Sequence, residues 1–402
     1  MTKPLSTAFN IDDLREAARR RLPRGLFEFV DRGTEDDLAV RNNRTAFERI
    51  ALRPRVLVDV SKRSQSINLF GAPSSQPLII APTGAAGLLC YQGEVEVARA
   101  AAKAGLPFTL STYSINSMEQ VADQAGGRLW FQLYMWPDRS LSHQLVQRAK
   151  AAGYEALVVT VDTAATPNRE YNQRNGFVLP FRVNRRNVFD LATHPGWLAR
   201  VMLRYLLASG MPRFENLPDS LQQSLAGLPA SRRILPKSDS LTWDDLRELR
   251  RMWSGPLLVK GVLDPADAAL AVDCGADAVI VSNHGGRNLD SAITPIRALP
   301  EILDRIDGRA DVMLDSGIRR GSDIAKAIAT GAKAVFVGRA PLWGVAVDGE
   351  RGAARALAIL AQELDRVMVF MGCATLAELD RSRLVVDHAC SEVVGPVNYR
   401  KK

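Results

Sequence analysis

The stretch with the clearest potential for chemistry runs from residue 278 to residue 290. A run of β-forming residues, Ala278-Val279-Ile280-Val281, passes directly into Ser282-Asn283-His284-Gly285-Gly286-Arg287. A histidine that titrates near neutrality and a permanently charged arginine thus follow one buried strand, three residues apart. The two glycines let the backbone turn sharply and approach a ligand closely. The segment suggests a general base beside an anion-binding cation, although a solvated surface loop would also fit these residues.

Short apolar runs that could position this loop recur along the chain. They begin near Leu78, Phe108, Leu129, Ala156, Leu257, Ala278, Asp311 and Ala334, and helical patterns such as 94–104, 141–152, 265–274 and 321–330 lie between most of them. This alternation indicates βαβ units and a parallel sheet. Eight units predict an α/β fold, a (β/α)8 TIM barrel with its active site at the carboxyl ends of the strands. The alternative is an open doubly wound sheet, which would gather polar groups at one switch point, whereas here nearly every run ends in a polar side chain.

Two segments fall outside the eight units of this single predicted domain, residues 1–402. Residues 11–50 read as an N-terminal helical extension. The chain between the fourth and fifth strands far exceeds one βα unit, and we assign residues 176–240 to an inserted loop. Between residues 182 and 213 it carries six arginines against one acid, Asp190, interleaved with Trp, Leu, Met and Tyr. Such a segment is typical of contact with an anionic membrane surface, but a lid or a helix packed on a neighbouring subunit would also fit.

Composition limits the other function classes. The net charge of +8 favours anionic surfaces or substrates. No nucleic-acid-binding motif accompanies the charge, so we expect no nucleic-acid partner. The four cysteines are far apart without a CxxC pair, which indicates neither a metal site nor a disulfide framework. Without an apolar signal segment or a run of about 18 apolar residues, the chain is expected to be cytoplasmic. With the basic insertion, it is expected to be peripheral on the inner face of the cell membrane.

The ends of the last two predicted strands suggest a phosphate site. They read Asp315-Ser316-Gly317-Ile318-Arg319 and Gly338-Arg339. Barrels often bind phosphate in the loops after strands seven and eight, through backbone N–H groups and a helix N-terminus. Arg319 and Arg339 could hold the dianion, although structural arginines are the alternative. Because no GxGxxG sequence opens a dinucleotide-binding unit, a tightly bound phosphorylated cofactor such as flavin mononucleotide (FMN) is expected instead.

Polar residues at the other strand ends fit the ring of a flavin. Ser111, Gln132 and Thr160 supply neutral hydrogen-bonding groups for one edge of the ring. Lys260 supplies a cation where negative charge develops when a flavin is reduced. A structural lysine paired with an acid is the alternative for Lys260.

A second group of strand-end residues fits an acidic substrate. His284 could accept a substrate proton, with Asp162 orienting the imidazole and stabilising its charged form. Arg287 and Arg169 could bind a carboxylate, and Tyr134 could hydrogen-bond the reacting oxygen. A base, a carboxylate clamp and a flavin on one rim describe the oxidation of a 2-hydroxy carboxylate.

With these residues placed, the chain resembles the FMN-dependent (S)-2-hydroxy-acid dehydrogenases and oxidases from about residue 8 to residue 380. The motif Ser282-Asn283-His284-Gly285-Gly286-Arg287-x-Leu289-Asp290 is specific to that family, and segments 131–134, 160–162, 260–261 and 315–321 reinforce it in the right order. The resemblance implies oxidation of an (S)-2-hydroxy acid to the 2-oxo acid, with the roles given above. It also implies further contacts. The ribityl phosphate would be held by Asp315, Gly317, Arg319, Gly338 and Arg339. The rest of the cofactor would be contacted by Pro82, Thr83, Gly84 and Ser282, and the substrate by Phe29 and Gly84.

Three positions depart from common family patterns. The family usually places a tyrosine on the substrate carboxylate where this chain has Phe29, and the lost hydroxyl removes about 1–3 kcal/mol of carboxylate binding. Relatives that act on hydroxymandelate also have phenylalanine there. Gly84 matches the mandelate and bacterial L-lactate dehydrogenases, whereas oxidases usually have alanine, and extra space beside the flavin favours electron transfer to a carrier over dioxygen. Asn288 stands where glutamine is common, and we attach no function to it.

The resemblance is closest in character to (S)-mandelate dehydrogenase, whose membrane segment the insertion resembles, and to bacterial L-lactate dehydrogenase. It implies a homotetrameric enzyme that prefers mandelate or a similar aryl acid, then L-lactate, and passes electrons to a membrane quinone. Hydride transfer and proton abstraction to a carbanion are both compatible with His284. The enzymatic alternative is a soluble oxidase that reduces dioxygen to hydrogen peroxide. An alternative of another class is a non-catalytic flavin-binding barrel, against which the complete set of base, acid and arginines argues.

Overall fold

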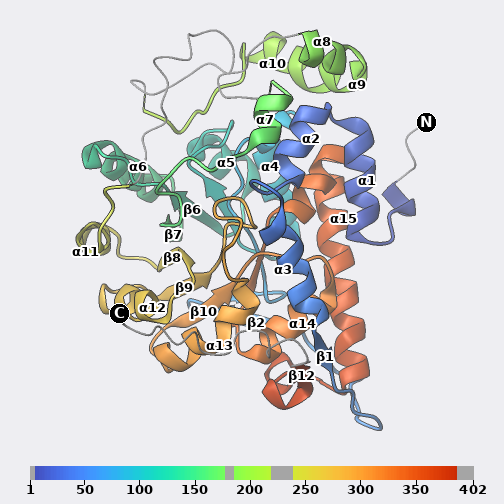
Figure 1. Ribbon diagram of the computed structural model, residues 1–402, viewed down its shortest axis with the longest axis vertical. Coiled ribbons are helices and arrows are strands. Elements are labelled where there is room, and N and C mark those ends of the chain that lie inside the picture. Colours follow the sequence, from blue (N-terminus) through green and yellow to red (C-terminus); the bar gives the residue numbers. More distant parts are fainter. Residues whose placement is uncertain (1–4, 177–184, 219–238, 387–402) are drawn as a thin grey trace, which may run out of the picture.

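Eight parallel strands close into a barrel in the computed structural model, which describes residues 5–176, 185–218 and 239–386 (Figure 1). The strands follow one another around the barrel in chain order, and the last pairs with the first. They are β4 (Leu78–Ile80), β5 (Phe108–Ser111), β6 (Leu129–Leu133), β7 (Ala156–Thr160), β8 (Leu257–Val262), β9 (Ala278–Val281), β10 (Asp311–Leu314) and β11 (Val335–Val337). The predicted TIM barrel is confirmed and the open sheet is excluded. Only the eighth strand begins away from its predicted start, one residue later.

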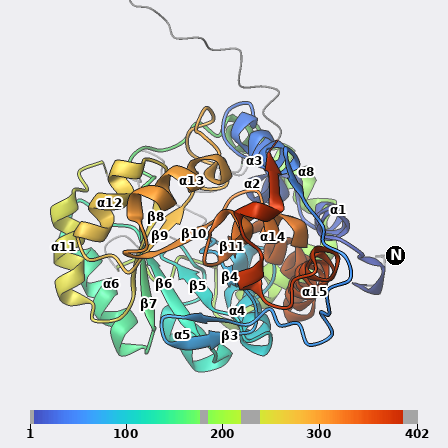
Figure 2. The same ribbon diagram turned by 90° about the horizontal axis from the view of Figure 1, so that it is seen from below.

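Helices surround the barrel, as the view from below shows (Figure 2). Because helices cover the outside and side chains fill the inside, the strands are apolar on both faces. The helices are α4 (Gly93–Lys103), α5 (Met118–Ala125), α6 (Arg139–Ala151), α11 (Trp243–Met252), α12 (Pro265–Asp273), α13 (Pro295–Ile306), α14 (Gly321–Thr330) and α15 (Arg339–Met371), the last broken at Asp348 and Gly349.

The barrel interior is a packed core closed at one end by a hairpin. Trp130, Met313 and Phe336 are buried inside the barrel, and the rings of Trp130 and Phe336 lie 6.1 Å apart. The hairpin of β2 (Ile67–Leu69) and β3 (Ala72–Ser74) adds the fully buried Leu69 to this cluster. The interior is therefore no channel, and a ligand can enter only at the opposite, carboxyl end of the strands.

The N-terminal extension docks on the loop that follows β9. It comprises η1 (Leu5–Thr7), α1 (Ile11–Arg21), α2 (Arg24–Asp31) and α3 (Leu38–Glu48), and β1 (Ile50–Leu52) then pairs with β12 (Leu384–Val386). The Asp290 carboxylate accepts hydrogen bonds from the backbone N–H groups of Asp36, at 3.1 Å, and Ala39, at 2.9 Å. The buried amides of Asn43 and Asn283 exchange two hydrogen bonds of 2.9 and 2.8 Å. The extension thus holds the loop that carries His284.

The insertion lies between β7 and β8, as predicted, over the carboxyl ends of the strands (top of Figure 1). The helix α7 (Glu170–Arg174) precedes it, and it contains α8 (Arg185–Ala192), α9 (Pro195–Trp197), the π-helix η3 (Leu198–Met202) and α10 (Leu203–Ala208). Residues 177–184 and 219–238 of the predicted segment, Arg182 included, lie outside the described residues. Trp197 Nε1 donates to the Leu88 carbonyl at 2.8 Å, and the Tyr205 hydroxyl accepts from the Gln92 N–H at 3.0 Å. No helix in the described part of the chain is long and apolar enough to cross a membrane.

We expect Asn43→Ala to lower the free energy of unfolding by about 1–3 kcal/mol, because it leaves buried polar atoms of Asn283 without their partner. Urea unfolding followed by tryptophan fluorescence measures the change. Asn42→Ala is the matched control, since Asn42 is exposed on the same helix. It should change stability by less than about 0.5 kcal/mol. Equal effects of the two substitutions would show that the amide pair contributes nothing specific.

Candidate active site

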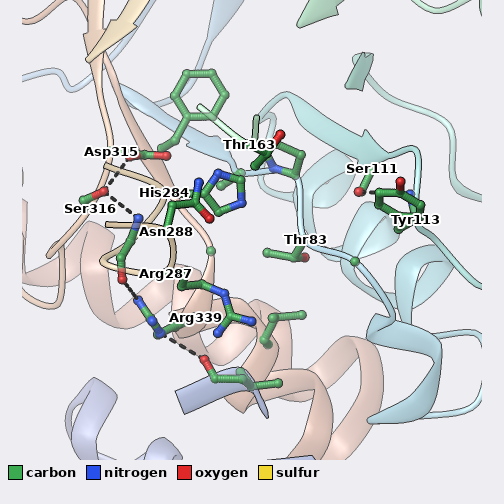
Figure 3. A pocket seen from close by; sticks show the side chains of 18 of the residues that line it. Thr83, Ser111, Tyr113, Thr163, His284, Arg287, Asn288, Asp315, Ser316 and Arg339 are labelled. Carbon is green, nitrogen blue, oxygen red and sulfur yellow. Dashed lines mark hydrogen bonds between the residues drawn. The ribbon is translucent and has the colours of Figure 1, made fainter. Parts of the chain in front are cut away.

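A pocket of about 370 Å³ opens at the carboxyl ends of the strands. Residues from the extension, from the strand ends and from the insertion line it together. In Figure 3, Asp315 and Ser316 lie on one side of the pocket and Ser111 and Tyr113 on the other, with His284 between them. Parts of the chain that are far apart in sequence therefore meet at one cavity.

His284 is held as a neutral base at the edge of this pocket. Its Nδ1 lies 2.8 Å from Asp162 Oδ1, which selects the tautomer with the proton on Nδ1 and leaves the lone pair on Nε2 free to accept a proton. The Tyr134 hydroxyl lies 3.5 Å from that Nε2. Burial lowers the pKa of His284 and outweighs the effect of Asp162, which raises it. The imidazole is therefore neutral at physiological pH, as a base must be.

Two groups that support His284 keep the charge states this role needs. Burial opposes ionisation of Asp162, but the nearby His284 and Lys260 outweigh it and lower the Asp162 pKa, so the carboxylate stays charged. Burial raises the pKa of Tyr134, and Asp162 raises it further. The Tyr134 phenol therefore remains a hydrogen-bond donor.

Lys260 lies in a buried network at the end of β8. Its Nζ donates to Ser282 Oγ at 2.8 Å and pairs with Asp315 Oδ2 at 2.9 Å. Burial alone would lower the Lys260 pKa, but Asp315 and Asp162 raise it above its ordinary value. Lys260 therefore carries a positive charge at the pocket. The ion pair with an acid that was considered as an alternative role for Lys260 is also present.

Two further cations at the ends of β10 and β11 lack an acidic partner among the described residues. Arg319 lies over the Trp343 ring, 4.7 Å from its centroid, and Arg339 donates to the carbonyls of Val30, Gly285 and Arg32 at 2.8–3.0 Å. Burial, with help from neighbouring arginines, lowers the pKa of Arg319 to about 10 and that of Arg339 to about 9. An anion bound beside these guanidinium groups would offset the free-energy cost of burying their charge.

Gly317 lets the same loop pack closely against α3. Its φ is +94°, and a Cβ there would lie 2.5 Å from the Asn43 carbonyl oxygen. No larger residue fits at this position without displacing α3.

Two more arginines, Arg169 and Arg287, face the same pocket, and Arg287 shares the Arg32 carbonyl with Arg339. Burial and the neighbouring Arg287 lower the pKa of Arg169 to about 9, and the buried Arg169 Nε has no hydrogen-bond partner among the described residues. Arg287 donates to the carbonyls of Phe29 and Arg32 at 2.7 and 2.9 Å. The Phe29 ring lies 5.2 Å from the Arg287 guanidinium, so it supports this cation although it lacks the usual tyrosine hydroxyl.

Aromatic side chains form the remaining wall. The Tyr113 ring lies 5.2 Å from the Tyr134 ring and 5.7 Å from that of Phe214, which meets it edge-on. Beside them, a methyl group at Gly84 would lie only 3.1 Å from the Tyr113 carbonyl oxygen, so Tyr113 bounds the space that glycine leaves.

Most predicted site residues line this pocket. They are Phe29, Pro82, Thr83, Gly84, Ser111, Tyr134, Arg169, Lys260, His284, Arg287, Asp315, Gly317, Arg319, Gly338 and Arg339. Four others, Asp162, Gln132, Thr160 and Ser282, lie behind the lining. Three of these contact it: Asp162 through His284, Ser282 through Lys260 and Gln132 through Ser111, whose Oγ donates to Gln132 Oε1 at 3.1 Å.

Sequence reasoning missed several pocket residues, Phe214 and Ser316 among them, and undervalued Asn288. Phe214 comes from the end of the insertion, where nothing in its neighbourhood marks it as a ligand contact. Beside it, Asn216 is fully buried, donates to Ser114 Oγ at 2.6 Å and accepts from the Met118 N–H at 2.8 Å. Ser316 belongs to the Asp315–Gly321 segment, which was assigned to phosphate binding without a separate role for this residue. Asn288, given no function, lines the pocket and donates to the Asp162 carbonyl at 2.7 Å.

Comparisons with known proteins agree with this geometry. The family model described as FMN-dependent dehydrogenase matches residues 18–386.

The chain belongs to the FMN-dependent dehydrogenase family.

Relatives in this family include both dehydrogenases and oxidases. The chain is 41% identical to an L-lactate oxidase of Nostoc sp., over 94% of this chain and 99% of that protein. It is 40% identical to (S)-mandelate dehydrogenase of Pseudomonas putida, over 92% of each. A crystal structure of the monotopic membrane protein (S)-mandelate dehydrogenase superposes with a TM-score of 0.88 at 39% identity, covering 95% of this chain and 100% of that one. The protein is thus an FMN-dependent enzyme that oxidises a 2-hydroxy acid.

The pocket of this family member fits FMN. Arg319 and Arg339, which have no acidic partner among the described residues, match a phosphate dianion in charge, and Gly317 lines the pocket beside them. Near the ends of β6 and β7, the buried Gln132 Nε2 and Thr160 Oγ1 have no hydrogen-bond partner among the described residues. Such orphaned groups are expected where a polar ligand completes the structure.

We expect Arg319→Gln to raise the dissociation constant of FMN about tenfold or more, because it removes one charged hydrogen-bonding group from the phosphate site. Fluorescence titration of apoprotein with FMN measures the constant. Arg320→Gln is the matched control: the neighbouring Arg320 points to Glu363, 2.7 Å away, and does not line the pocket. It should leave FMN affinity within about twofold. Equal affinities for both variants would contradict the assignment of Arg319.

Proposed function

We propose that the protein oxidises an (S)-2-hydroxy acid with an aryl side chain, mandelate or a similar acid, to the 2-oxo acid, and that L-lactate is a poorer substrate. Its electrons would pass to a membrane quinone. The observation that carries the chemistry is the His284–Asp162 pair, 2.8 Å apart, which opens on a pocket that also holds Arg169 and Arg287.

In this proposal two arginines fix the substrate and His284 accepts its proton. Arg169 and Arg287 bind the carboxylate, which relieves the repulsion between them. His284 Nε2 accepts one proton, from the hydroxyl or from Cα, and Asp162 stabilises the imidazolium that results. The Tyr134 phenol donates to the substrate oxygen. FMN, when bound, accepts the two electrons.

The cofactor contacts divide between the two sides of the pocket. Gly317, Arg319, Gly338 and Arg339 would hold the ribityl phosphate. Asp315, predicted to join them, is an anion whose two oxygens are engaged by Lys260 and Ser316, so its role would be to hold Lys260. Pro82, Thr83 and Gly84 would contact the ring, and Ser111, Gln132 and Thr160 would supply its hydrogen bonds. Lys260, held by Ser282 and Asp315, would supply the positive charge that stabilises the reduced flavin at the pyrimidine part of the ring.

The aromatic wall favours an aryl substrate. Phe29, Tyr113 and Phe214 line the pocket and offer ring faces and edges to a phenyl group. A methyl group, as in L-lactate, would cover little of this surface. The L-lactate enzymes among the relatives keep lactate as the second candidate.

Two features support a membrane quinone as the electron acceptor. Gly84 is the residue expected to favour electron transfer to a carrier over dioxygen, and the insertion presents an apolar surface. Val188, Phe189, Leu203, Leu206 and Leu207, the apolar face of α8 and α10, are 49–79% exposed. We assign this face to the membrane surface, where a quinone would be available. Arg204 stacks on Tyr91 and Arg213 pairs with Glu215, so two of the basic residues of this segment are engaged within the protein. The mandelate dehydrogenase relative of known structure is a monotopic membrane protein, which supports the same assignment.

The oxidase relative favours one alternative acceptor, dioxygen. An oxygen electrode distinguishes the two: an oxidase consumes oxygen and releases hydrogen peroxide as the 2-hydroxy acid is oxidised, whereas the proposed dehydrogenase consumes little. A homotetramer in the cytoplasm, with no nucleic-acid partner, remains the prediction for its assembly and location.

Anaerobic stopped-flow reduction of the bound flavin tests the base and the substrate. (S)-Mandelate should reduce the flavin faster, at lower concentration, than L-lactate. His284→Ala should slow reduction by either acid about a hundredfold or more while FMN stays bound, because it removes the group placed to accept the proton. Reduction at an unchanged rate would remove the base assignment, and faster reduction by L-lactate would overturn the substrate preference.

The same assay at varied pH reports the protonation of His284. Because only the neutral ring accepts a proton and burial lowers its pKa, activity should persist as the pH falls and then decline with a midpoint below about 6.5. Asp162→Asn removes the group that raises this pKa, so its midpoint should lie lower still.

Membrane contact is tested by Phe189→Asp, with Phe370→Asp as the matched control. Both phenylalanines are 71% exposed, but Phe370 lies near the C-terminal end of α15, away from the insertion. Phe189→Asp should weaken binding to phosphatidylglycerol-containing vesicles about tenfold, because it places a charge where an apolar ring would insert. Phe370→Asp should bind like the parent, and both should oxidise substrate normally with a soluble dye as acceptor. Parental vesicle binding by Phe189→Asp would contradict the assignment.

A further inference from the structure

Ser316 combines an unusual backbone conformation with a position between two parts of the site. Its φ is +75°, in the left-handed region that glycine adopts more easily than other residues. Its Oγ donates to Asp315 Oδ1 at 2.7 Å and accepts from the Gly285 N–H at 2.9 Å (Figure 3). A side chain in a strained conformation persists when its contacts hold it there, so these two bonds point to a role for the hydroxyl.

The hydroxyl closes a ring of hydrogen bonds around the base. On its other side, the His284 N–H donates to Ser282 Oγ at 3.0 Å, and Ser282 Oγ also accepts from Lys260 Nζ at 2.8 Å. Lys260 pairs with Asp315 Oδ2 at 2.9 Å, and the second oxygen of that carboxylate accepts from Ser316. Two consecutive backbone amides, at residues 284 and 285, are thus tied to the two oxygens of one carboxylate.

The loop that carries His284 needs such restraint from outside. Three consecutive residues, His284, Gly285 and Gly286, have φ between +57° and +73°. Because two of them are glycines, the segment has little conformational preference of its own. The Gly285 peptide is instead held from both sides, by Ser316 at its N–H and by Arg339 at its carbonyl, 2.8 Å away.

We propose that Ser316 is a positioning residue, which orients His284 toward the substrate by holding the Gly285 amide against Asp315. This inference rests on the proposed role of His284 as the base. Since Asp315 also pairs with Lys260, the hydroxyl fixes the imidazole relative to the cation assigned to the flavin ring. The chain therefore sets the distance between base and cofactor without a direct contact between Ser316 and substrate.

The test is Ser316→Gly, because glycine accepts φ +75° and the substitution removes only the hydroxymethyl group. We expect the rate of flavin reduction at saturating (S)-mandelate, per bound FMN, to fall about tenfold or more, while the substrate dissociation constant changes less than about twofold. Asp307→Gly is the matched control: Asp307 is also a non-glycine residue with positive φ, +49°, but it is exposed at the end of α13. It should reduce at the parental rate.

The same substitution in a His284→Ala background separates positioning from general structural damage. If Ser316 acts through the imidazole, adding Ser316→Gly to His284→Ala should slow the residual reduction less than about twofold. A parental rate for Ser316→Gly, loss of FMN with an unchanged rate per bound flavin, or a full further loss in the His284→Ala background would each overturn the proposal. Unimpaired reduction by His284→Ala alone would instead overturn the proposed function.

Discussion

The site depends on buried positive charge that the protein itself does not neutralise. Arg169, Arg287, Arg319 and Arg339 all line one pocket, and none has an acidic partner among the described residues. Burial and mutual repulsion lower the pKa of three of them, and a bound anion would favour their charged forms. Arg287 and Arg339 donate to the same carbonyl, that of Arg32, so the four guanidinium groups form one cluster with enough charge for two anionic groups at once. A phosphate and a carboxylate are the groups that an FMN-dependent 2-hydroxy-acid oxidation brings together.

Such a charge cluster needs a scaffold whose stability comes from elsewhere. The barrel core, closed by the β2–β3 hairpin, and the surrounding helices supply it by burying apolar side chains on both faces of every strand. The N-terminal extension adds a second constraint, because Asp290 and Asn283 tie α3 to the loop that follows β9. The carbonyls of Phe29, Val30 and Arg32 then bind the guanidinium groups of Arg287 and Arg339. The extension is therefore part of the site, although it contributes mainly backbone carbonyl groups, which no sequence motif marks.

Most of the fold and much of the pocket could be predicted because they depend on local patterns. Apolar runs end where the strands end, and in a parallel barrel all those ends share one rim, so residues such as Ser111, Lys260 and His284 had to meet. The missed features depend on contacts between distant segments. Nothing near Phe214 indicates that the insertion returns it to Tyr113, and only the fold brings Asn43 to Asn283. For Ser316, the residue type alone does not reveal a left-handed backbone or its bond to Gly285. The free space expected at Gly84 was likewise limited by a neighbour, Tyr113, that is not adjacent in sequence.

The anchoring of the insertion has a consequence for how enzymes of this kind diversify. Its outer face meets the surroundings, yet Trp197, Tyr205 and Asn216 bond to the loops after β4 and β5, and Phe214 forms part of the pocket wall. One stretch of chain thus combines an exposed apolar face with part of the pocket wall. An exchange of this stretch between homologues, by recombination or by a protein engineer, would therefore alter the outer surface and the pocket together.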